Sequence, residues 1–259
     1  MAGAAALAVT LINILSLSSP GLSLLLALVP GLVTSIAYAA FTRGALFAAA
    51  PFSQGVAPDG LRVWAAMLII GFFLVIVFIV PGLVGIVIFA ILISPRYGEA
   101  IQQVQNDQAA TMALMERIFS ENPGMLFAFA LAYGLIWMML TSRLYLAAPA
   151  TVEQKRILTF ETWKWTKGNM WRIIGARAML LFPAYVAVSA VAYLVAGGFG
   201  LNVMDPASIQ GFAESNLPLY AVFNFSTSWL QLALYSALEA GLSAYLYKGL
   251  KPAEAITPT

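Results

Sequence analysis

The feature that most constrains this chain is an apolar run from Val63 to Ile93, 31 residues without a charged, amide or hydroxyl side chain. As one helix it would be about 46 Å long, which exceeds the bilayer core of about 30 Å. Pro81 and Gly82 lie inside the run, so either one helix kinks there or the chain re-enters the membrane as a half-helix. We favour the kinked helix, because no charge marks a loop at that point.

Composition extends this interpretation to the whole chain. The 259 residues are 61% hydrophobic and only 9% charged, whereas a soluble domain carries about 25% charged residues. The sequence therefore predicts an all-α, polytopic integral membrane bundle in a single domain, 1–259. Six transmembrane helices are expected, at about 2–17, 22–41, 63–93, 125–142, 173–196 and 219–247. The polar stretch 96–121 is expected to form an outer amphipathic helix, and 143–172 a cytoplasmic interfacial segment.

The distribution of Lys and Arg predicts the orientation. With the N-terminus inside, only Arg96 and Arg117 fall on outer segments. The other eleven bases fall on cytoplasmic ones: Arg43, Arg62, Arg143, Lys155, Arg156, Lys164, Lys167, Arg172, Arg177, Lys248 and Lys251. This bias predicts cytoplasmic N- and C-termini. The N-terminus has no basic region, so we expect a first span there and no cleaved signal peptide.

A basic, Trp-rich segment between two apolar spans is the first candidate site. It contains the residues expected at the lipid headgroup interface: Arg143, Lys155, Arg156, Trp163, Lys164, Lys167, Trp171 and Arg172. Thr159 is expected to cap a short helix, Phe160 to Lys167, which Gly168 ends. Aromatic rings can enter the headgroup layer while the bases meet lipid phosphates. The segment thus indicates either a lipid or partner site or charges that only set the topology.

Glu239 is the second candidate, because it stands in an otherwise apolar span. An isolated carboxylate in hydrocarbon is costly, so intramembrane acids are usually paired. Arg177 and Arg143 are expected at similar depth, and we favour a buried ion pair of Glu239 with Arg177 that holds the last span to its neighbours. A proton- or substrate-handling carboxylate, or partial exposure at the interface, are the alternatives.

The middle of the chain resembles known membrane proteins. Arg143, Ala148-Pro149, Phe160 to Lys167, Gly168-Asn169 and Trp171-Arg172 are similar to a pattern in bacterial inner-membrane proteins of the YciC-like kind. The same pattern occurs in the membrane domain of some glycerophosphodiester phosphodiesterases. In those enzymes the hydrolytic site is in a separate soluble barrel, so the resemblance implies an accessory protein of the bacterial inner (cytoplasmic) membrane and not an enzyme.

A short internal similarity links two segments that each follow a span. Thr42 to Pro51 resembles Thr141 to Pro149, and each precedes a further span that opens with Trp and Arg. A parallel duplication would explain the match, but chance similarity between Ala-rich segments is an equal alternative.

Several function classes are disfavoured by the residue inventory. The chain has no Cys and no His, which removes zinc sites, thiol nucleophiles and His-dependent acid–base chemistry. No catalytic residues, metal site, cofactor or nucleic-acid partner are expected, and the acids of 96–121 are expected to be solvated. The expected function is non-catalytic: binding of anionic lipids, a partner membrane protein or a second copy. The main alternative is a small-molecule or lipid transporter that uses Glu239 and helices broken at Pro-Gly pairs; a membrane-embedded lipid enzyme is disfavoured.

Overall fold

The computed structural model describes residues 1–18, 23–104, 107–202 and 205–252. All regular structure in these ranges is helical. The helices are α1 (Ala2–Ser18), α2 (Ser23–Phe47), α3 (Val56–Val104), α4 (Gln108–Glu121), α5 (Pro123–Arg143), α6 (Ala147–Gln154), α7 (Glu161–Trp165), α8 (Met170–Gly198), α9 (Pro206–Ser215), α10 (Leu217–Leu230), the π-helix η2 (Gln231–Ser236) and α11 (Ala237–Leu250). The all-helical prediction is confirmed.

The described residues form two compact units. Unit 1 comprises Met1–Ile69 and Ser142–Thr259, and unit 2 comprises Ile70–Thr141. The helices α3 and α5 contribute to both units, while α4 belongs to unit 2.

Three stretches are long and apolar enough to cross a membrane: Val56–Val104, Pro123–Gln154 and Met170–Gly198. In the most apolar window of Val56–Val104 only 6% of the residues are buried, so its side chains are free to contact lipid. The count of six spans goes beyond this finding and stays a prediction.

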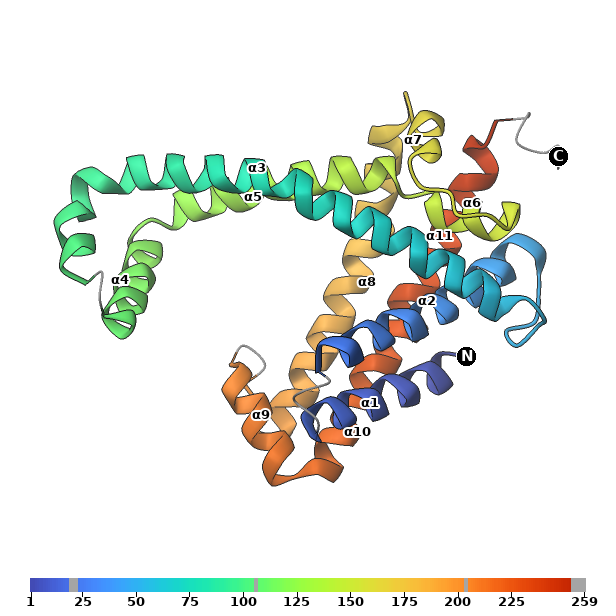
Figure 1. The fold of residues 1–259 in the computed structure, drawn as a ribbon, viewed down its shortest axis with the longest axis horizontal. Helices are drawn as coiled ribbons and strands as arrows, with labels where there is room; N and C mark the ends of the chain where they lie inside the picture. The colour runs from blue at the N-terminus through green and yellow to red at the C-terminus, as the bar shows by residue number, and fades with distance from the viewer. Residues whose placement is uncertain (19–22, 105–106, 203–204, 253–259) are drawn as a thin grey trace. The chain divides into compact units, whose positions relative to one another are not determined.

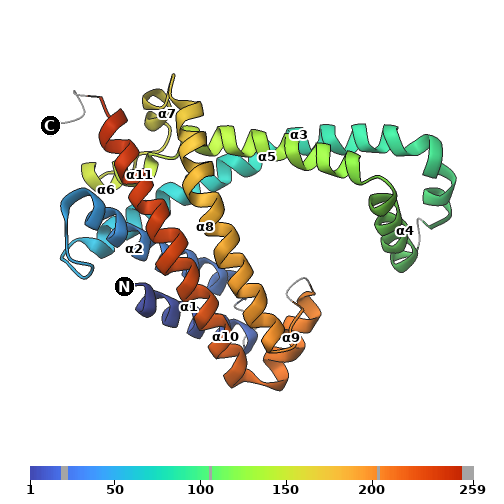
Figure 2. The ribbon, with the colours of Figure 1, turned by 180° about the vertical axis from the view of Figure 1, so that it is seen from behind.

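Unit 1 is a helical bundle built around α2 and α11. Figures 1 and 2 show α1 beside α2 and α10, and α11 beside α2 and α6. Ala5 and Ala6 of α1 are buried with Ala37 of α2, and such small side chains let two helix backbones approach closely. A second core lies where α6, α8 and α11 meet, with Tyr247 and Leu146 at 0% exposure.

Unit 2 packs the apolar parts of α3 and α5 together and adds α4. Gly85 of α3 faces Tyr133 of α5, and a Cβ on Gly85 would lie 2.8 Å from the Tyr133 hydroxyl. Ile93 and Tyr97 are buried with Ile118 of α4. The glycines after Pro81 therefore make room for an aromatic side chain of the neighbouring helix.

The prolines do not break helices in the way the transporter alternative requires. Helix α3 is continuous from Val56 to Val104 through Pro81, and α2 continues through Pro30. Pro123 begins α5, as expected for a residue without an N–H to donate. The re-entrant half-helix is therefore wrong for 63–93, and Pro20 lies outside the described residues.

Three sequence-based boundaries need correction. Residues 96–104 continue α3, and the amphipathic helix is α4, which Asp107 caps by accepting a hydrogen bond from the Ala110 N–H at 3.0 Å. The helix predicted at Phe160 to Lys167 is the shorter α7, and its N-cap position is Phe160, without a side-chain cap. Thr159 instead offers its carbonyl to the Thr162 hydroxyl at 2.7 Å.

The two similar segments adopt different structures after their arginines. Residues 48–50 following Arg43 are non-helical, whereas Ala147–Gln154 following Arg143 form α6. Their threonines behave alike: Thr42 and Thr141 each donate to the carbonyl four residues earlier, at 2.9 and 2.8 Å.

Candidate functional site

The basic segment 143–172 is built on a buried framework. Thr151 both accepts from the Leu158 N–H at 3.0 Å and donates to the Leu158 carbonyl at 3.2 Å. Leu158 and Ile173 are fully buried, together with Thr162 and Thr166. The bends between α6, α7 and α8 use left-handed backbone at Lys155 (φ 52°) and Gly168 (φ 82°). The framework therefore fixes the backbone that carries the basic side chains.

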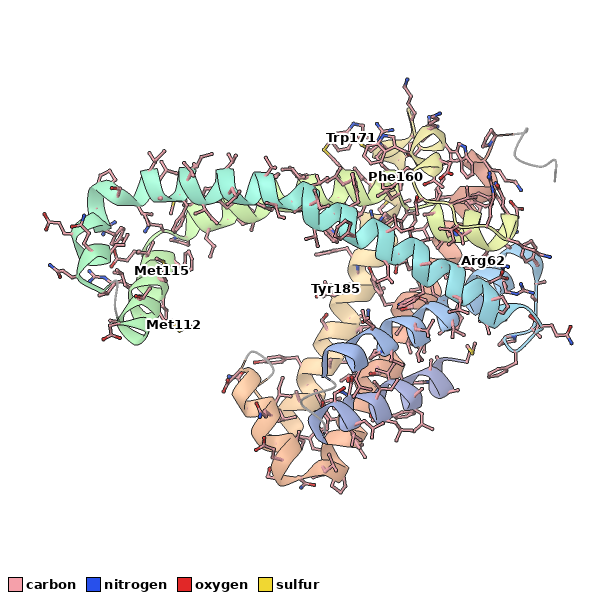
Figure 3. All side chains as sticks on the ribbon, viewed as in Figure 1. Arg62, Met112, Met115, Phe160, Trp171 and Tyr185 are labelled. Carbon is pink, nitrogen blue, oxygen red and sulfur yellow. The ribbon has the colours of Figure 1, made fainter. Side chains whose placement is uncertain are left out.

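The outer face of this segment carries charges and aromatic rings together. Its exposed bases are Lys155, Arg156, Lys164, Lys167 and Arg172. Trp171 is 66% exposed and Phe160 is 42% exposed, and Figure 3 shows both at the end of unit 1 formed by α7 and the start of α8. Exposed aromatic rings among bases are typical of a membrane–water interface. We call these seven residues the basic face.

Arg143 and Trp163, which the sequence placed with this face, contact each other instead. The Arg143 guanidinium lies 5.8 Å from the centroid of the Trp163 ring, within the range of a cation–π interaction. Both side chains are half-buried, and the Arg143 carbonyl accepts a hydrogen bond from Thr166 at 3.2 Å. Their contacts thus join the end of α5 to α7.

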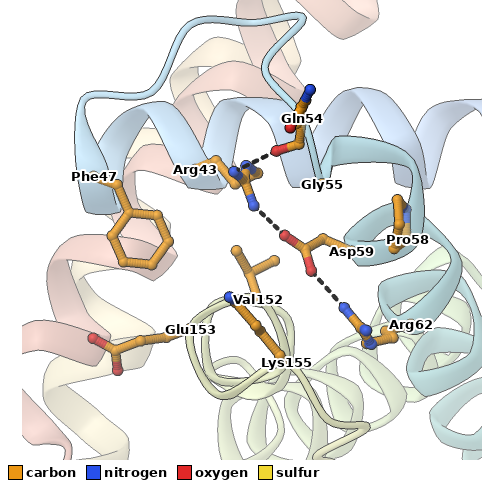
Figure 4. A pocket seen from close by; sticks show the side chains of 10 residues that line it. All are labelled: Arg43, Phe47, Gln54, Gly55, Pro58, Asp59, Arg62, Val152, Glu153 and Lys155. Carbon is orange, nitrogen blue, oxygen red and sulfur yellow. Dashed lines mark hydrogen bonds and ion pairs between the residues drawn. The ribbon is translucent and has the colours of Figure 1, made fainter.

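Next to the basic face, unit 1 has a pocket of about 560 Å³. Three bases line it: Arg43 from α2, Arg62 from α3 and Lys155 from the end of α6. Asp59, whose side chain is 3% exposed, accepts a hydrogen bond from Arg43 and another from Arg62, the latter at 2.7 Å (Figure 4). One carboxylate therefore orients two guanidinium groups toward the same space.

Gly55 makes this arrangement possible. Its φ is +90°, a left-handed conformation that favours glycine. A Cβ at Gly55 would lie 3.2 Å from a guanidinium nitrogen of Arg43, and that guanidinium also donates to the Gln54 carbonyl at 2.9 Å. The loop before α3 thus closes over Arg43.

The second acid of the pocket is directed elsewhere. Glu153 accepts hydrogen bonds from the Tyr247 hydroxyl and from Lys251, the latter at 2.7 Å. In Figure 4 its carboxylate points away from Asp59. The lining has three bases and two acids, a formal +1, and Lys251 offsets the charge of Glu153. The space between Arg43, Arg62 and Lys155 is therefore positively charged.

Arg177 and Glu239, which the sequence predicts to form an ion pair, belong to a polar cluster of unit 1. Arg177 donates to the Ser142 hydroxyl at 2.8 Å and lies 4.7 Å from the centroid of the Tyr145 ring. The Tyr145 hydroxyl donates to the Glu239 carbonyl at 3.2 Å. A direct ion pair between Arg177 and Glu239 stays a prediction.

Within the described ranges, no group of three or more Asp and Glu side chains could hold a metal ion. The chain matches no family model, no curated protein and no solved structure. The resemblance to YciC-like proteins therefore rests on the residues quoted above alone.

Sequence reasoning missed the pocket. Arg43 and Arg62 were counted only as charges that set the orientation, and Asp59 was not considered. The spacing of Asp59 and Arg62, three residues apart near the start of a helix, was the one available signal. The partner across the loop, Arg43, is 16 residues away from Asp59, and no periodicity links the two.

Proposed function

We propose that this chain is a non-catalytic integral protein of the bacterial inner membrane that binds anionic lipids through its basic face, with both termini in the cytoplasm. The observation that carries the proposal is the exposure of Trp171 and Phe160 among five exposed bases on a buried framework. Each base near an anionic surface contributes about 1 kcal/mol. The rings can anchor the same face at headgroup depth.

Neutralising the basic face outside the pocket tests the proposal. In the purified triple variant Arg156→Gln, Lys164→Gln, Lys167→Gln, retained phosphatidylglycerol and cardiolipin should fall by about half or more, measured by lipid mass spectrometry. The matched control exchanges the same three residues for the other base (Arg156→Lys, Lys164→Arg, Lys167→Arg) and should retain the wild-type lipid content. Equal anionic lipid content in all three proteins would contradict the proposal.

A second candidate function is lipid transport, which the polar cluster around Arg177 and Glu239 favours. Both residues lie in segments predicted to span the membrane, where ionisable side chains are rare and mark functional sites. The π-helix Gln231–Ser236 ends three residues before Glu239, and π-helical turns are frequent at such sites.

Lipid transport is tested by scrambling in proteoliposomes. Wild-type protein should accelerate the loss of inner-leaflet fluorescent phosphatidylglycerol to dithionite, and Glu239→Gln should slow that loss at least about tenfold. Leu238→Ala, at an exposed neighbouring position, is the control. A wild-type rate equal to that of empty liposomes would remove this candidate.

A further inference from the structure

The pocket beside the basic face is lined by three bases, and its carboxylate Asp59 already accepts hydrogen bonds from two of them. Arg43 and Arg62 each use one guanidinium nitrogen on Asp59. Building on the proposed function, we infer that this pocket binds the phosphate group of a single anionic lipid molecule, held by Arg43, Arg62 and Lys155.

The donors that remain fit an anion of this kind. An arginine has five N–H donors in a fixed fork that matches phosphate oxygens. Arg62 uses one nitrogen on Asp59, at 2.7 Å, and its side chain is 34% exposed, so its other N–H groups are available to a ligand. Lys155 is exposed and lines the same pocket. Basic side chains from α2, from α3 and from the residue after α6 therefore line one cavity.

Asp59 supports binding without occupying the cavity. Its side chain is 3% exposed and both of its oxygens accept from arginine. A carboxylate held in this way fixes the orientation of the guanidinium groups before a ligand arrives, which lowers the entropy cost of binding. Because Glu153 is directed to Tyr247 and Lys251, its charge adds little repulsion.

The apolar part of the lining favours a lipid over free phosphate. Phe47, Pro58 and Val152 line the same pocket as the bases, and Phe47 is 49% exposed. Near it in the chain, Phe52 is 74% exposed and Leu61 is 50% exposed. A phosphate among the bases would thus leave its glycerol and acyl chains beside apolar side chains. The volume, about 560 Å³, is within the range of small-molecule sites and exceeds what phosphate alone would fill.

The test titrates purified protein in detergent with dioleoyl phosphatidylglycerol and counts bound molecules by native mass spectrometry. Wild type should show one tight site, and the double variant Arg62→Gln, Lys155→Gln should bind at this site at least about tenfold more weakly. The matched control is Lys164→Gln, Lys167→Gln, which removes the same charge from the basic face and should keep the tight site. Dioleoyl phosphatidylcholine is the neutral-headgroup control and should not fill it.

Every other outcome overturns part of the inference. If Arg62→Gln, Lys155→Gln keeps the tight site while the triple variant of the basic face loses lipid, the pocket inference is wrong and the proposed function stands. If wild type takes up both lipids equally, both proposals fail. If inorganic phosphate displaces the tight phosphatidylglycerol at equal concentration, the site is for soluble phosphate and the lipid assignment is wrong. Lys155→Gln alone, at an exposed residue, provides the same comparison should the double variant not fold.

Discussion

Two clusters of this protein have the same chemistry in different surroundings. In unit 1, Asp59 joins Arg43 and Arg62, and its side chain is 3% exposed. In unit 2, Glu121 joins Arg96 at 2.9 Å and Arg117 at 2.7 Å, and its side chain is 28% exposed. Each cluster is one carboxylate between two arginines. They differ in how much water reaches the carboxylate.

That difference decides what each cluster contributes. Removing one partner of a buried pair leaves a charge without compensation, at a cost of about 3–5 kcal/mol. Exposed pairs are solvated and screened by salt, so they contribute little. The Glu121 cluster also occupies Arg96 and Arg117, the two bases predicted to lie on the outer side. We therefore expect the Asp59 cluster to organise the fold and the Glu121 cluster to act locally.

The largest expected effect is on labelling from outside the cell, which should reach the segment of one cluster and not that of the other. The charge bias predicts that the two clusters lie on opposite sides of the membrane. Because the chain has no cysteine, single cysteines are added at Met112 of α4 and Lys164 of α7, both exposed. An impermeant maleimide on intact cells should label Met112→Cys and not Lys164→Cys. Both should react after permeabilisation; the reverse pattern in intact cells would make the predicted orientation wrong.

Asp59→Asn should destabilise unit 1 strongly, by about 3 kcal/mol, because two arginines lose their shared carboxylate. Thermal unfolding in detergent, followed by circular dichroism, measures the loss. The triple exchange Arg43→Met, Asp59→Leu, Arg62→Met removes the buried charges together and should be milder. An Asp59→Asn variant as stable as wild type would show that the cluster does not organise the fold.

Gly55→Ala should have a smaller effect, about 1 kcal/mol or somewhat more, because φ is +90° and the new methyl group crowds Arg43. Gly168→Ala is the matched control: its φ is +82°, and nothing lies within 4 Å of an added Cβ. Both variants share the backbone cost, and only Gly55→Ala disturbs the pocket. Equal unfolding temperatures for the two variants would mean that the contact with Arg43 does not affect stability.

The smallest effect is expected for Glu121→Gln, at most about 2 °C in the unfolding temperature. The Arg117 guanidinium and the Tyr97 hydroxyl hold the pKa of Glu121 below its ordinary value. A lowered pKa means that the carboxylate stabilises the fold above the ordinary pKa of glutamate and loses this contribution as the pH falls toward the lowered value. The difference between wild type and Glu121→Gln should therefore shrink on acidification and in high salt. If Glu121→Gln lowered the unfolding temperature as much as Asp59→Asn, the two clusters would not differ in what they contribute to stability.

The sequence alone determined the helical class and the membrane-compatible segments, because both follow from local properties. The run Val63–Ile93 has no side chain that requires water, and it lies in a continuous helix. The basic, Trp-rich character of 143–172 was equally visible, since charge and aromatic content can be counted along the chain.

Only the tertiary structure decided what the charged residues contact. Arg43 meets Asp59 across a loop whose course depends on the left-handed conformation of Gly55. Arg143 packs against Trp163 and does not join the basic face. Lys155 lines a pocket with residues from α2 and α3 that are about a hundred positions away in the sequence. Such contacts depend on how helices pack side by side, and helical periodicity along one segment contains no information about its neighbours in space.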